Sequence, residues 1–155
     1  MNRRQRVVIT EFVVVVVITA IAVFAILNVK DVVNRSEAMR AMQELGQRVL
    51  AYRNQNRSLP PESFIIEIED ELTGYSRLGR VTYRALWISF EATGDEILAY
   101  RQINYRSLFV GKGYVVLRLD GRVEWMKKQQ FEELLAHQQT QREIEMLHKR
   151  PHRDL

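Results

Sequence analysis

The sequence predicts an α+β protein in which a long N-terminal helix packs on a small antiparallel sheet and a C-terminal helix follows. Three observations predict this fold. A long apolar run near the N-terminus continues without a break into a segment with a helical apolar stripe. Two alternating runs that flank Asp120-Gly121 indicate a β-hairpin. After Trp125 the spacing of apolar residues changes to that of a helix.

The helix begins with an apolar segment. From Phe12 to Leu27 the only polar residue is Thr19, and with Val7 and Val29 as its ends the segment reaches the ~20 residues that cross a bilayer core. A signal peptide has a shorter apolar core, about 7–15 residues, and a small-residue cleavage site. No such site follows Leu27. A buried soluble helix is disfavoured because the Val and Ile run leaves no polar face. We therefore expect an uncleaved membrane anchor.

The flanking charges predict the orientation of this anchor. Arg3, Arg4 and Arg6 precede it, whereas Lys30 and Asp31 follow it and nearly cancel. Because basic flanks stay on the cytoplasmic side, the N-terminus is expected inside and the rest of the chain outside the membrane.

The second half of the helix is amphipathic. Apolar residues recur at three- and four-residue steps at Met39, Met42, Leu45, Val49 and Tyr52. One helix is expected from about Val7 to about Asn54, roughly 70 Å long at ~1.5 Å per residue, ended by Pro60-Pro61. Gly46 lies beside the apolar stripe, where a glycine costs about 1 kcal/mol relative to alanine. It therefore predicts a close approach of the sheet or of a neighbouring helix.

The remaining elements follow in order. Residues 62–79 are compatible with a short strand or helix and a loop. Residues 80–90 and 96–103 alternate and predict strands, and residues 113–125 predict a hairpin with a two-residue turn at Asp120-Gly121, both at positive φ. Phe131, Leu134 and Leu135 mark a C-terminal helix whose spacing extends through Ile144 and Leu147. The tail beyond Lys149 is expected to be disordered.

This pattern divides the chain into four sections. Residues 1–30 form the cytoplasmic tip and the transmembrane helix, and residues 31–57 its amphipathic continuation. Residues 58–137 form a small α+β head, and residues 138–155 a polar helical or disordered tail.

Composition excludes several classes of protein. The net charge is +4 and the pI about 9.6, but the excess lies partly in the N-terminal arginines and partly in the C-terminal tail. Basic residues between them alternate with acids, which indicates a solvated surface, and no nucleic-acid partner is expected. The absence of cysteine excludes a disulfide scaffold and a cysteine zinc site.

No catalytic or cofactor site is predicted. His137, His148 and His152 lack metal-hydrolase spacing, residues 111–113 lack the rest of a phosphate-binding loop, and no Gly-x-Ser-x-Gly occurs. We expect no enzyme, no cofactor and no small-molecule substrate. Carboxylates suited to calcium occur at Asp120 and Glu124, and in the run Glu67, Glu69, Asp70 and Glu71, but without EF-hand spacing. No metal is therefore expected.

Three segments resemble the type IV pilins and the type II secretion pseudopilins. Residues 7–27 resemble the family's N-terminal helix, with Glu11 at the position of its glutamate and Val7 at that of its first mature residue. Residues 41–62 resemble the amphipathic half of that helix, with its Tyr, Asn-rich turn and Pro. Residues 96–135 resemble the hairpin and helix of members with H-X9-DG-type endings, although Arg122 replaces the usual His.

The resemblance implies a single-span protein of the inner (cytoplasmic) membrane whose head is periplasmic or extracellular. It implies a structural subunit or an accessory component of a secretion or pilus-like assembly, with other pilin-like subunits or its own copies as partners through the N-terminal helix. The alternative from another class is a membrane-tethered binding module that holds an envelope partner without polymerising.

Glu11 is the main candidate site residue. A carboxylate at the centre of a membrane span costs about 2.5–3.5 kcal/mol, so its presence indicates a function. The resemblance implies that Glu11 pairs with the N-terminal amine of a neighbouring subunit and sets the register of assembly. Alternatively, Glu11 lies one turn inside the interface and pairs with Arg4, with Arg6 or with water.

The peptidase site departs from the family. Its leader ends in Gly, the residue required before the cut, and this chain has Arg6 before Val7. The resemblance therefore implies that processing fails and that no free amine forms at Val7. An accessory subunit is expected rather than a major filament subunit.

Overall fold

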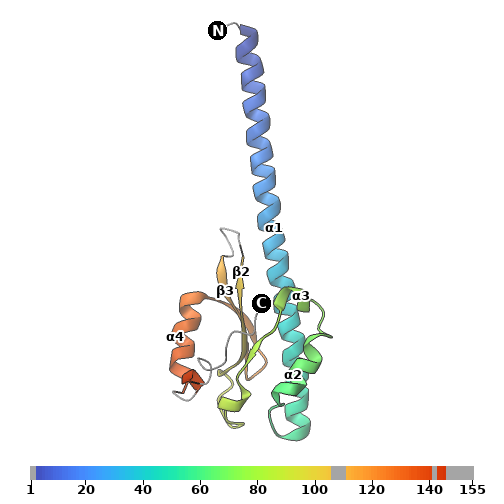
Figure 1. Ribbon diagram of the computed structural model, residues 1–155, viewed down its shortest axis with the longest axis vertical. Coiled ribbons are helices and arrows are strands. Elements are labelled where there is room, and N and C mark those ends of the chain that lie inside the picture. The colour runs from blue at the N-terminus through green and yellow to red at the C-terminus, as the bar shows by residue number, and fades with distance from the viewer. Residues whose placement is uncertain (1–2, 106–110, 141–142, 146–155) are drawn as a thin grey trace.

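The computed structural model describes residues 3–105, 111–140 and 143–145 of the chain. Its elements are α1 (Arg3–Asn56), α2 (Glu62–Glu69), α3 (Tyr75–Leu78), β1 (Thr82–Tyr83), the 3-10 helix η1 (Ala85–Trp87), β2 (Ile97–Asn104), β3 (Lys112–Arg118), β4 (Val123–Lys127) and α4 (Lys128–Gln138). The first half of α1 projects far beyond the head, and its second half packs along the sheet (Figure 1). The predicted α+β class is confirmed.

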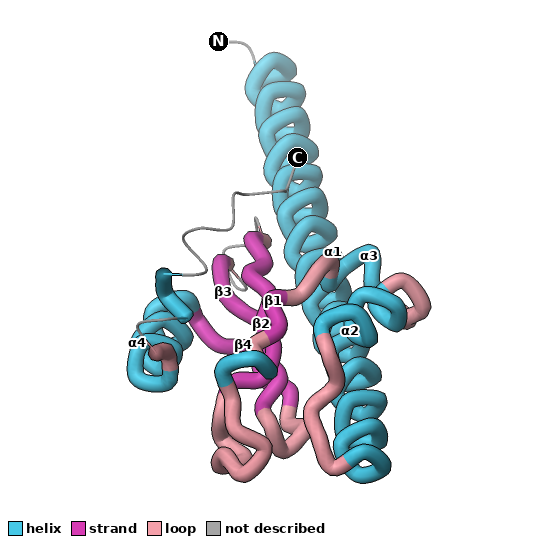
Figure 2. Tube along the Cα trace, turned by 60° about the horizontal axis from the view of Figure 1, so that its bottom comes forward, coloured by secondary structure: helices cyan, strands magenta, loops and turns pink. Residues whose placement is uncertain are grey.

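The sheet has four strands in the order β1-β2-β3-β4, and every neighbouring pair is antiparallel. The second half of α1 lies on one side of this sheet and α4 on the other (Figures 1 and 2). Because successive residues of β3 point to opposite faces, the strand contributes to both layers. Its residues from Gly113 to Leu117 are accordingly all buried.

The larger core lies between α1 and the sheet. It holds the predicted stripe residues Met42, Leu45 and Val49, together with Val115 and Leu117 of β3. Gly46 lies within this contact, where an added Cβ would stand 2.7 Å from the Leu117 Cδ1 atom. The predicted close approach at Gly46 is confirmed, and its partner is the sheet.

A second core lies between the opposite face of the sheet and α4. Phe131 and Leu135 of α4 pack with Ile97, Tyr114 and Val116. The Phe131 ring stacks on that of Tyr114, with ring centroids 3.8 Å apart. The apolar spacing predicted for the C-terminal helix thus marks the face of α4 that contacts the sheet.

The strand predicted over residues 80–90 is wrong for most of its length. Only Thr82 and Tyr83 are extended, and η1 follows directly. The backbone turns at Arg84, with φ −111° and ψ 9°, and carries the Arg84 side chain into the interior, where 1% of its surface is exposed. Burial of this charged side chain, rather than local strand preference, decides the path of the chain here.

The predicted hairpin between β3 and β4 is confirmed, but its turn differs. The Gly121 N–H donates to the Arg118 carbonyl at 2.9 Å, and the Arg118 N–H donates to the Arg122 carbonyl at 2.9 Å. The loop therefore holds Leu119, Asp120 and Gly121, and of the last two only Gly121 has positive φ, at 89°. This corresponds to a turn followed by a glycine bulge, in which one position alone needs the left-handed region.

Other expectations concern the segments between the main elements and the tail. The strand predicted over 96–103 is confirmed as β2, and residues 62–79 form α2 and α3. Ile144 lies in the described segment 143–145, which is helical. Leu147 and the tail beyond Lys149 lie outside the described residues.

Candidate functional site

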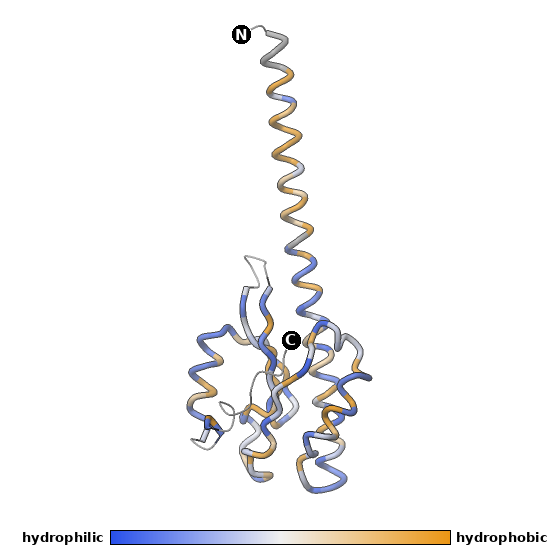
Figure 3. Tube along the Cα trace, in the orientation of Figure 1, coloured by the Kyte–Doolittle hydropathy of each residue, from blue (hydrophilic) through white to orange (hydrophobic). Residues whose placement is uncertain are grey.

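The first half of α1 exposes a continuous apolar surface. Every described Val, Ile and Phe side chain from Val8 to Val29 is exposed, with exposed fractions from 46% to 68%. Figure 3 shows this half of the helix as almost uniformly hydrophobic. It is the one helix of the described chain that is long and apolar enough to cross a membrane. An exposed apolar surface of this size is typical of a segment that contacts lipid or another protein.

Two polar side chains of this segment donate hydrogen bonds to backbone carbonyls one helical turn earlier. The Thr19 hydroxyl donates to the Val15 carbonyl at 2.8 Å, and the Asn28 amide donates to the Phe24 carbonyl at 2.7 Å. Both groups are therefore satisfied within the helix itself, as a nonpolar environment requires.

Glu11 is exposed on the apolar half of α1, and no cation of the described side chains forms an ion pair with it. Arg6 and Val7 belong to α1, but their side chains, like that of Arg4, lie outside the described ones. The register role of Glu11 and the failed cleavage after Arg6 both stay predictions.

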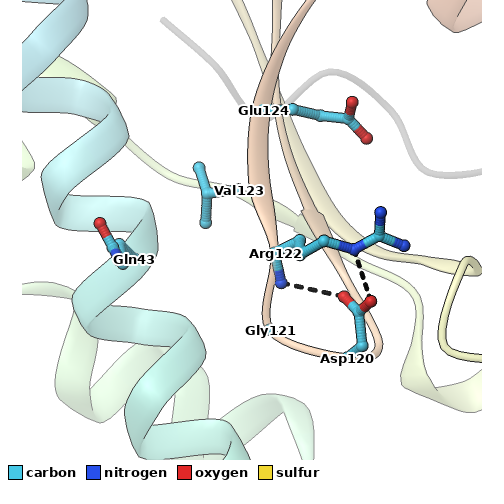
Figure 4. A pocket seen from close by; sticks show the side chains of 6 residues that line it. All are labelled: Gln43, Asp120, Gly121, Arg122, Val123 and Glu124. Carbon is cyan, nitrogen blue, oxygen red and sulfur yellow. Dashed lines mark hydrogen bonds and ion pairs between the residues drawn. The ribbon is translucent and has the colours of Figure 1, made fainter.

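The hairpin residues Asp120 and Glu124 are engaged by arginines. The Arg122 backbone N–H and its Nε atom donate to Asp120 at 3.0 Å and 2.6 Å (Figure 4), and Arg122 also contacts Asp95. Desolvation opposes the charged form of Asp120, but these hydrogen bonds outweigh it and lower its pKa. Arg118 pairs with Glu124 in the same way. Both carboxylates therefore stabilise the hairpin.

Two carboxylates of the acidic run at the end of α2, those of Glu69 and Glu71, have protein partners. Glu69 is buried and accepts a hydrogen bond from the Val81 N–H at 2.9 Å. Desolvation raises the pKa of Glu69. Glu71 pairs with Arg48 at 2.8 Å. Among the described residues, no group of three His, Asp or Glu side chains is placed to hold a metal ion.

The histidines do not form a site within the described part of the chain. His137 is exposed in the last turn of α4, and His148 and His152 lie outside the described residues. No catalytic arrangement therefore arises from the described side chains that the sequence singled out.

The sequence did not predict a buried ion pair between Arg84 and Glu143. Arg84 donates from Nε and Nη2 to the two carboxylate oxygens of Glu143 at 2.6 Å and 3.0 Å, and each side chain is 1% exposed. Arg84 also donates to the carbonyls of Ile97 and Gln138 at 2.7 Å and 3.2 Å. Nothing in the local sequence signals this pairing, since the partners are 59 residues apart. Through these hydrogen bonds Arg84 links the segment after α4, which contains Glu143, to Ile97 at the start of β2.

A groove between α1 and β4, which we call the α1–β4 groove, was also missed. It has a volume of about 480 Å³ and is lined by Val32, Arg35, Ser36, Met39, Arg40, Gln43 and Val123. A second hollow adjoins it at Gln43 and Val123 and extends to the hairpin (Figure 4). The only sequence signal was the polar character of one face of the amphipathic helix.

Two aromatic residues lie beside the α1–β4 groove. The Arg35 guanidinium lies over the Trp125 ring, 5.0 Å from its centroid, and the Tyr105 ring lies 5.7 Å from that of Trp125. Desolvation, followed by the charge of Asp31, raises the pKa of Tyr105 to about 12. The Tyr105 hydroxyl is therefore neutral at physiological pH.

The chain matches no protein-family model, no curated protein and no solved structure.

Proposed function

We propose that this protein is a membrane-anchored, pilin-like structural subunit or accessory component of a type II secretion or type IV pilus-like assembly. The observation that carries the proposal is the apolar half of α1, which is exposed from Val8 to Val29 and continuous with the amphipathic half that packs on the sheet. A helix built in this way can be buried by lipid before assembly and by other helices after it.

The head supports the same proposal. A helix packed on a four-stranded antiparallel sheet, with an Asp120-Gly121 hairpin and a following helix, has the order of elements that the sequence resemblance implies. In this proposal the N-terminus is cytoplasmic, the anchor lies in the inner membrane and the head lies outside the cytoplasm. Glu11 is the one charged residue between Val8 and Val29 and is assigned to the register of assembly.

The α1–β4 groove favours a second candidate function, a tethered module that holds an envelope partner through its head and never polymerises. Such a module has a monomeric span, whereas an assembly subunit has contacts between the helices of neighbouring copies. The helix contacts therefore separate the two candidates.

Cysteine crosslinking in native membranes tests the proposal. The chain has no cysteine, so Val14→Cys and Val17→Cys each introduce a unique thiol on exposed apolar positions of α1. We expect an oxidant to produce crosslinked dimers, or adducts with a second pilin-like subunit, from both variants. Because the register depends on the carboxylate, adding Glu11→Ala is expected to reduce the crosslinked fraction while the chain stays in the membrane.

Ser63→Cys serves as the control, since Ser63 is exposed on α2 in the head. Crosslinks that form equally from Ser63→Cys report random collision and contradict subunit assembly. An absence of crosslinks from Val14→Cys and Val17→Cys supports the tethered module instead. Crosslinks that survive Glu11→Ala unchanged contradict only the register role.

The N-terminus decides between an accessory component and a major filament subunit. We expect intact-mass analysis of protein from native membranes to show a chain that is not cut between Arg6 and Val7, because Arg6 is too large for a peptidase that requires Gly. A mature chain that begins at Val7 would instead have a free amine for the Glu11 of a neighbour. That result would restore the ordinary filament-subunit assignment.

A further inference from the structure

Strand β4 is an open edge of the sheet in the part of the chain that the structure describes. The order β1-β2-β3-β4 places β4 at one end, and no described strand pairs with its outer side. The residues of β3 from Gly113 to Leu117 are all buried, whereas no residue of β4 is buried. Because α1 and α4 lie on the two faces of the sheet (Figures 1 and 2), the exposure of β4 comes from its edge.

The hydrogen bonds of the hairpin identify the backbone groups at this edge. The Arg118 N–H donates to the Arg122 carbonyl, so these two residues occupy a hydrogen-bonded pair of positions. Such pairs alternate along an antiparallel ladder, and β3 and β4 pair without a register shift. The N–H and C=O groups of Val123 and Trp125 and the N–H of Lys127 therefore point away from β3. None of these groups has a hydrogen-bond partner among the described residues.

β4 lacks the features that protect most exposed edges. Natural edge strands are blocked by proline, by charged side chains, by a bulge or by a covering segment. β4 has no proline and no bulge; of its charged residues, Glu124 pairs with Arg118 and Lys127 stands at the end of the strand. The opposite side of the sheet is covered in part, since β1 pairs with β2 at Ala99 and Tyr100. The edge of β4 is therefore suited to accept another strand.

The α1–β4 groove runs beside this edge and has the length of a short extended segment. On α1 it reaches from Val32 to Gln43, about 17 Å at 1.5 Å per residue. This distance corresponds to about five residues in a strand, and β4 itself has 5 residues. The adjoining hollow continues along β4 to the hairpin, where Val123 points toward α1 (Figure 4).

The lining of the groove determines which side chains an added strand would carry. Alternate side chains of a strand point to opposite faces of the sheet. Those on the α1 side would meet Val32, Met39 and Val123, which favour apolar residues. Those on the other side would lie next to Glu124, whose side chain is 41% exposed, and polar residues are favoured there.

We propose that the α1–β4 groove binds an extended segment of a partner protein, which pairs with β4 as a fifth strand of the sheet. The segment has about five residues, in which apolar side chains alternate with polar ones. Main-chain hydrogen bonds with Val123, Trp125 and Lys127 provide affinity, and the contacts with α1 select the apolar side chains. The inference goes beyond the proposed function, because it concerns the head and not the contacts of the apolar half of α1.

A second copy that pairs through its own β4 is a poorer occupant. An antiparallel pair of identical strands is related by a two-fold axis, so the two copies would run in opposite directions along the strands. Their α1 helices would then point away from each other. Two such chains do not cross one membrane from the same side, as the proposed span of α1 requires.

Disulfide tethering on the full chain in detergent tests the inference. The chain has no cysteine, so Ser36→Cys places a unique thiol in the lining of the groove. The probe is a five-residue peptide of alternating Val and Thr with a thiol linker at one end. At exchange equilibrium, we expect the mixed disulfide to be about tenfold more stable with Ser36→Cys than with Ser63→Cys, as two main-chain hydrogen bonds provide. Equal stability at Ser63, which is exposed on α2, would overturn the inference.

Backbone methylation of the probe distinguishes strand pairing from contact with the apolar lining alone. Methyl groups on alternate peptide nitrogens remove the donors along one edge of the probe and leave its side chains unchanged. Because only one edge of an added strand faces β4, we expect one of the two alternating patterns to abolish the preference for Ser36→Cys and the other to retain it. The same result from both patterns would overturn strand pairing.

Lys127→Pro removes one edge donor from the protein itself. The φ angle of Lys127 is −65°, the value at which proline is fixed, so the change introduces no backbone strain. In the Ser36→Cys background, we expect Lys127→Pro to weaken the mixed disulfide about fivefold relative to Lys127→Ala, the effect of one hydrogen bond. Lys127→Ala loses the same charge and keeps the N–H. Equal mixed disulfides from the two variants would contradict pairing with β4.

Two further measurements test other occupants of the groove. Truncation after Glu145 is expected to leave the tethering unchanged, and a gain in mixed disulfide would assign the groove to the C-terminal tail. Without a probe, hydrogen exchange of the Trp125 N–H is expected to be independent of protein concentration. Exchange that slows as the concentration rises would assign the edge to a second copy. Either result would overturn the assignment to a partner protein.

Discussion

Glu143→Gln is expected to destabilise the head by about 3–5 kcal/mol, because it leaves the Arg84 guanidinium buried without a compensating charge. Both side chains are 1% exposed, so water does not screen the unpaired cation. The two short bonds from Arg84 to the carboxylate are made by a charged acceptor, which a neutral amide does not replace. Denaturant unfolding of the full chain in detergent, followed by near-ultraviolet circular dichroism, measures the loss.

Glu145→Gln is the control for this prediction. Glu145 lies in the same described segment but is exposed, so its loss is expected to change the unfolding free energy by no more than about 0.5 kcal/mol. The double variant Arg84→Met/Glu143→Leu removes both charges and is expected to recover most of the lost stability. If Glu143→Gln behaves like Glu145→Gln, the ion pair is not buried in solution.

Phe131→Ala is expected to cost about 3–5 kcal/mol, the range for removing a buried aromatic side chain. The Phe131 ring is 1% exposed and lies between Tyr114, at 3.8 Å, and Tyr100, at 4.8 Å. It is the largest fully buried side chain of the core between α4 and the sheet. Its removal leaves a cavity that the strands on one side and the short helix on the other cannot close without moving apart.

The location of the damage distinguishes this effect from a general loss of stability. Because the core between α1 and the sheet contains none of these rings, amide hydrogen exchange is expected to accelerate more in α4 than in residues 38–50 of α1. Glu132→Ala is the control, since Glu132 is 54% exposed and its pair with Lys128 is worth only a few tenths of a kcal/mol. A Phe131→Ala loss equal to that of the control would show that α4 does not pack on the sheet.

Elements with strong local signals were predictable from the sequence. These elements are the apolar and amphipathic halves of α1, strand β2 and the hairpin at Asp120-Gly121. The signal for each of them, a hydrophobic periodicity or a pair of turn residues, lies entirely within one short stretch of sequence. The contact at Gly46 was also predictable. Glycine destabilises a helix relative to alanine, so a glycine beside the apolar stripe indicates that another segment packs too closely there for a side chain. The candidate site residue Glu11 was identified by the same local reasoning, as one charge in an apolar run.

The features that depend on distant partners were not predictable. The strand expected at 80–90 ends at Tyr83 because the Arg84 side chain points inward and pairs with Glu143. The alternation of apolar and polar residues does not indicate a partner so far away in the sequence. The turn at Asp120-Gly121 depends on the register of β3 and β4, in which Arg118 lies opposite Arg122 and leaves three residues for the loop. The α1–β4 groove requires residues from both α1 and the last strand.

The sequence by itself determined the apolar helix, its amphipathic continuation, strand β2 and the hairpin of β3 and β4, because hydrophobic periodicity acts over neighbouring residues. The tertiary structure alone decided that α4 covers the second face of the sheet and that Arg84 is buried. It also decided that Arg35 lies over Trp125 beside an open groove. The physical reason is that burial and charge pairing are properties of the surroundings of a side chain, and those surroundings come from segments far away in the chain.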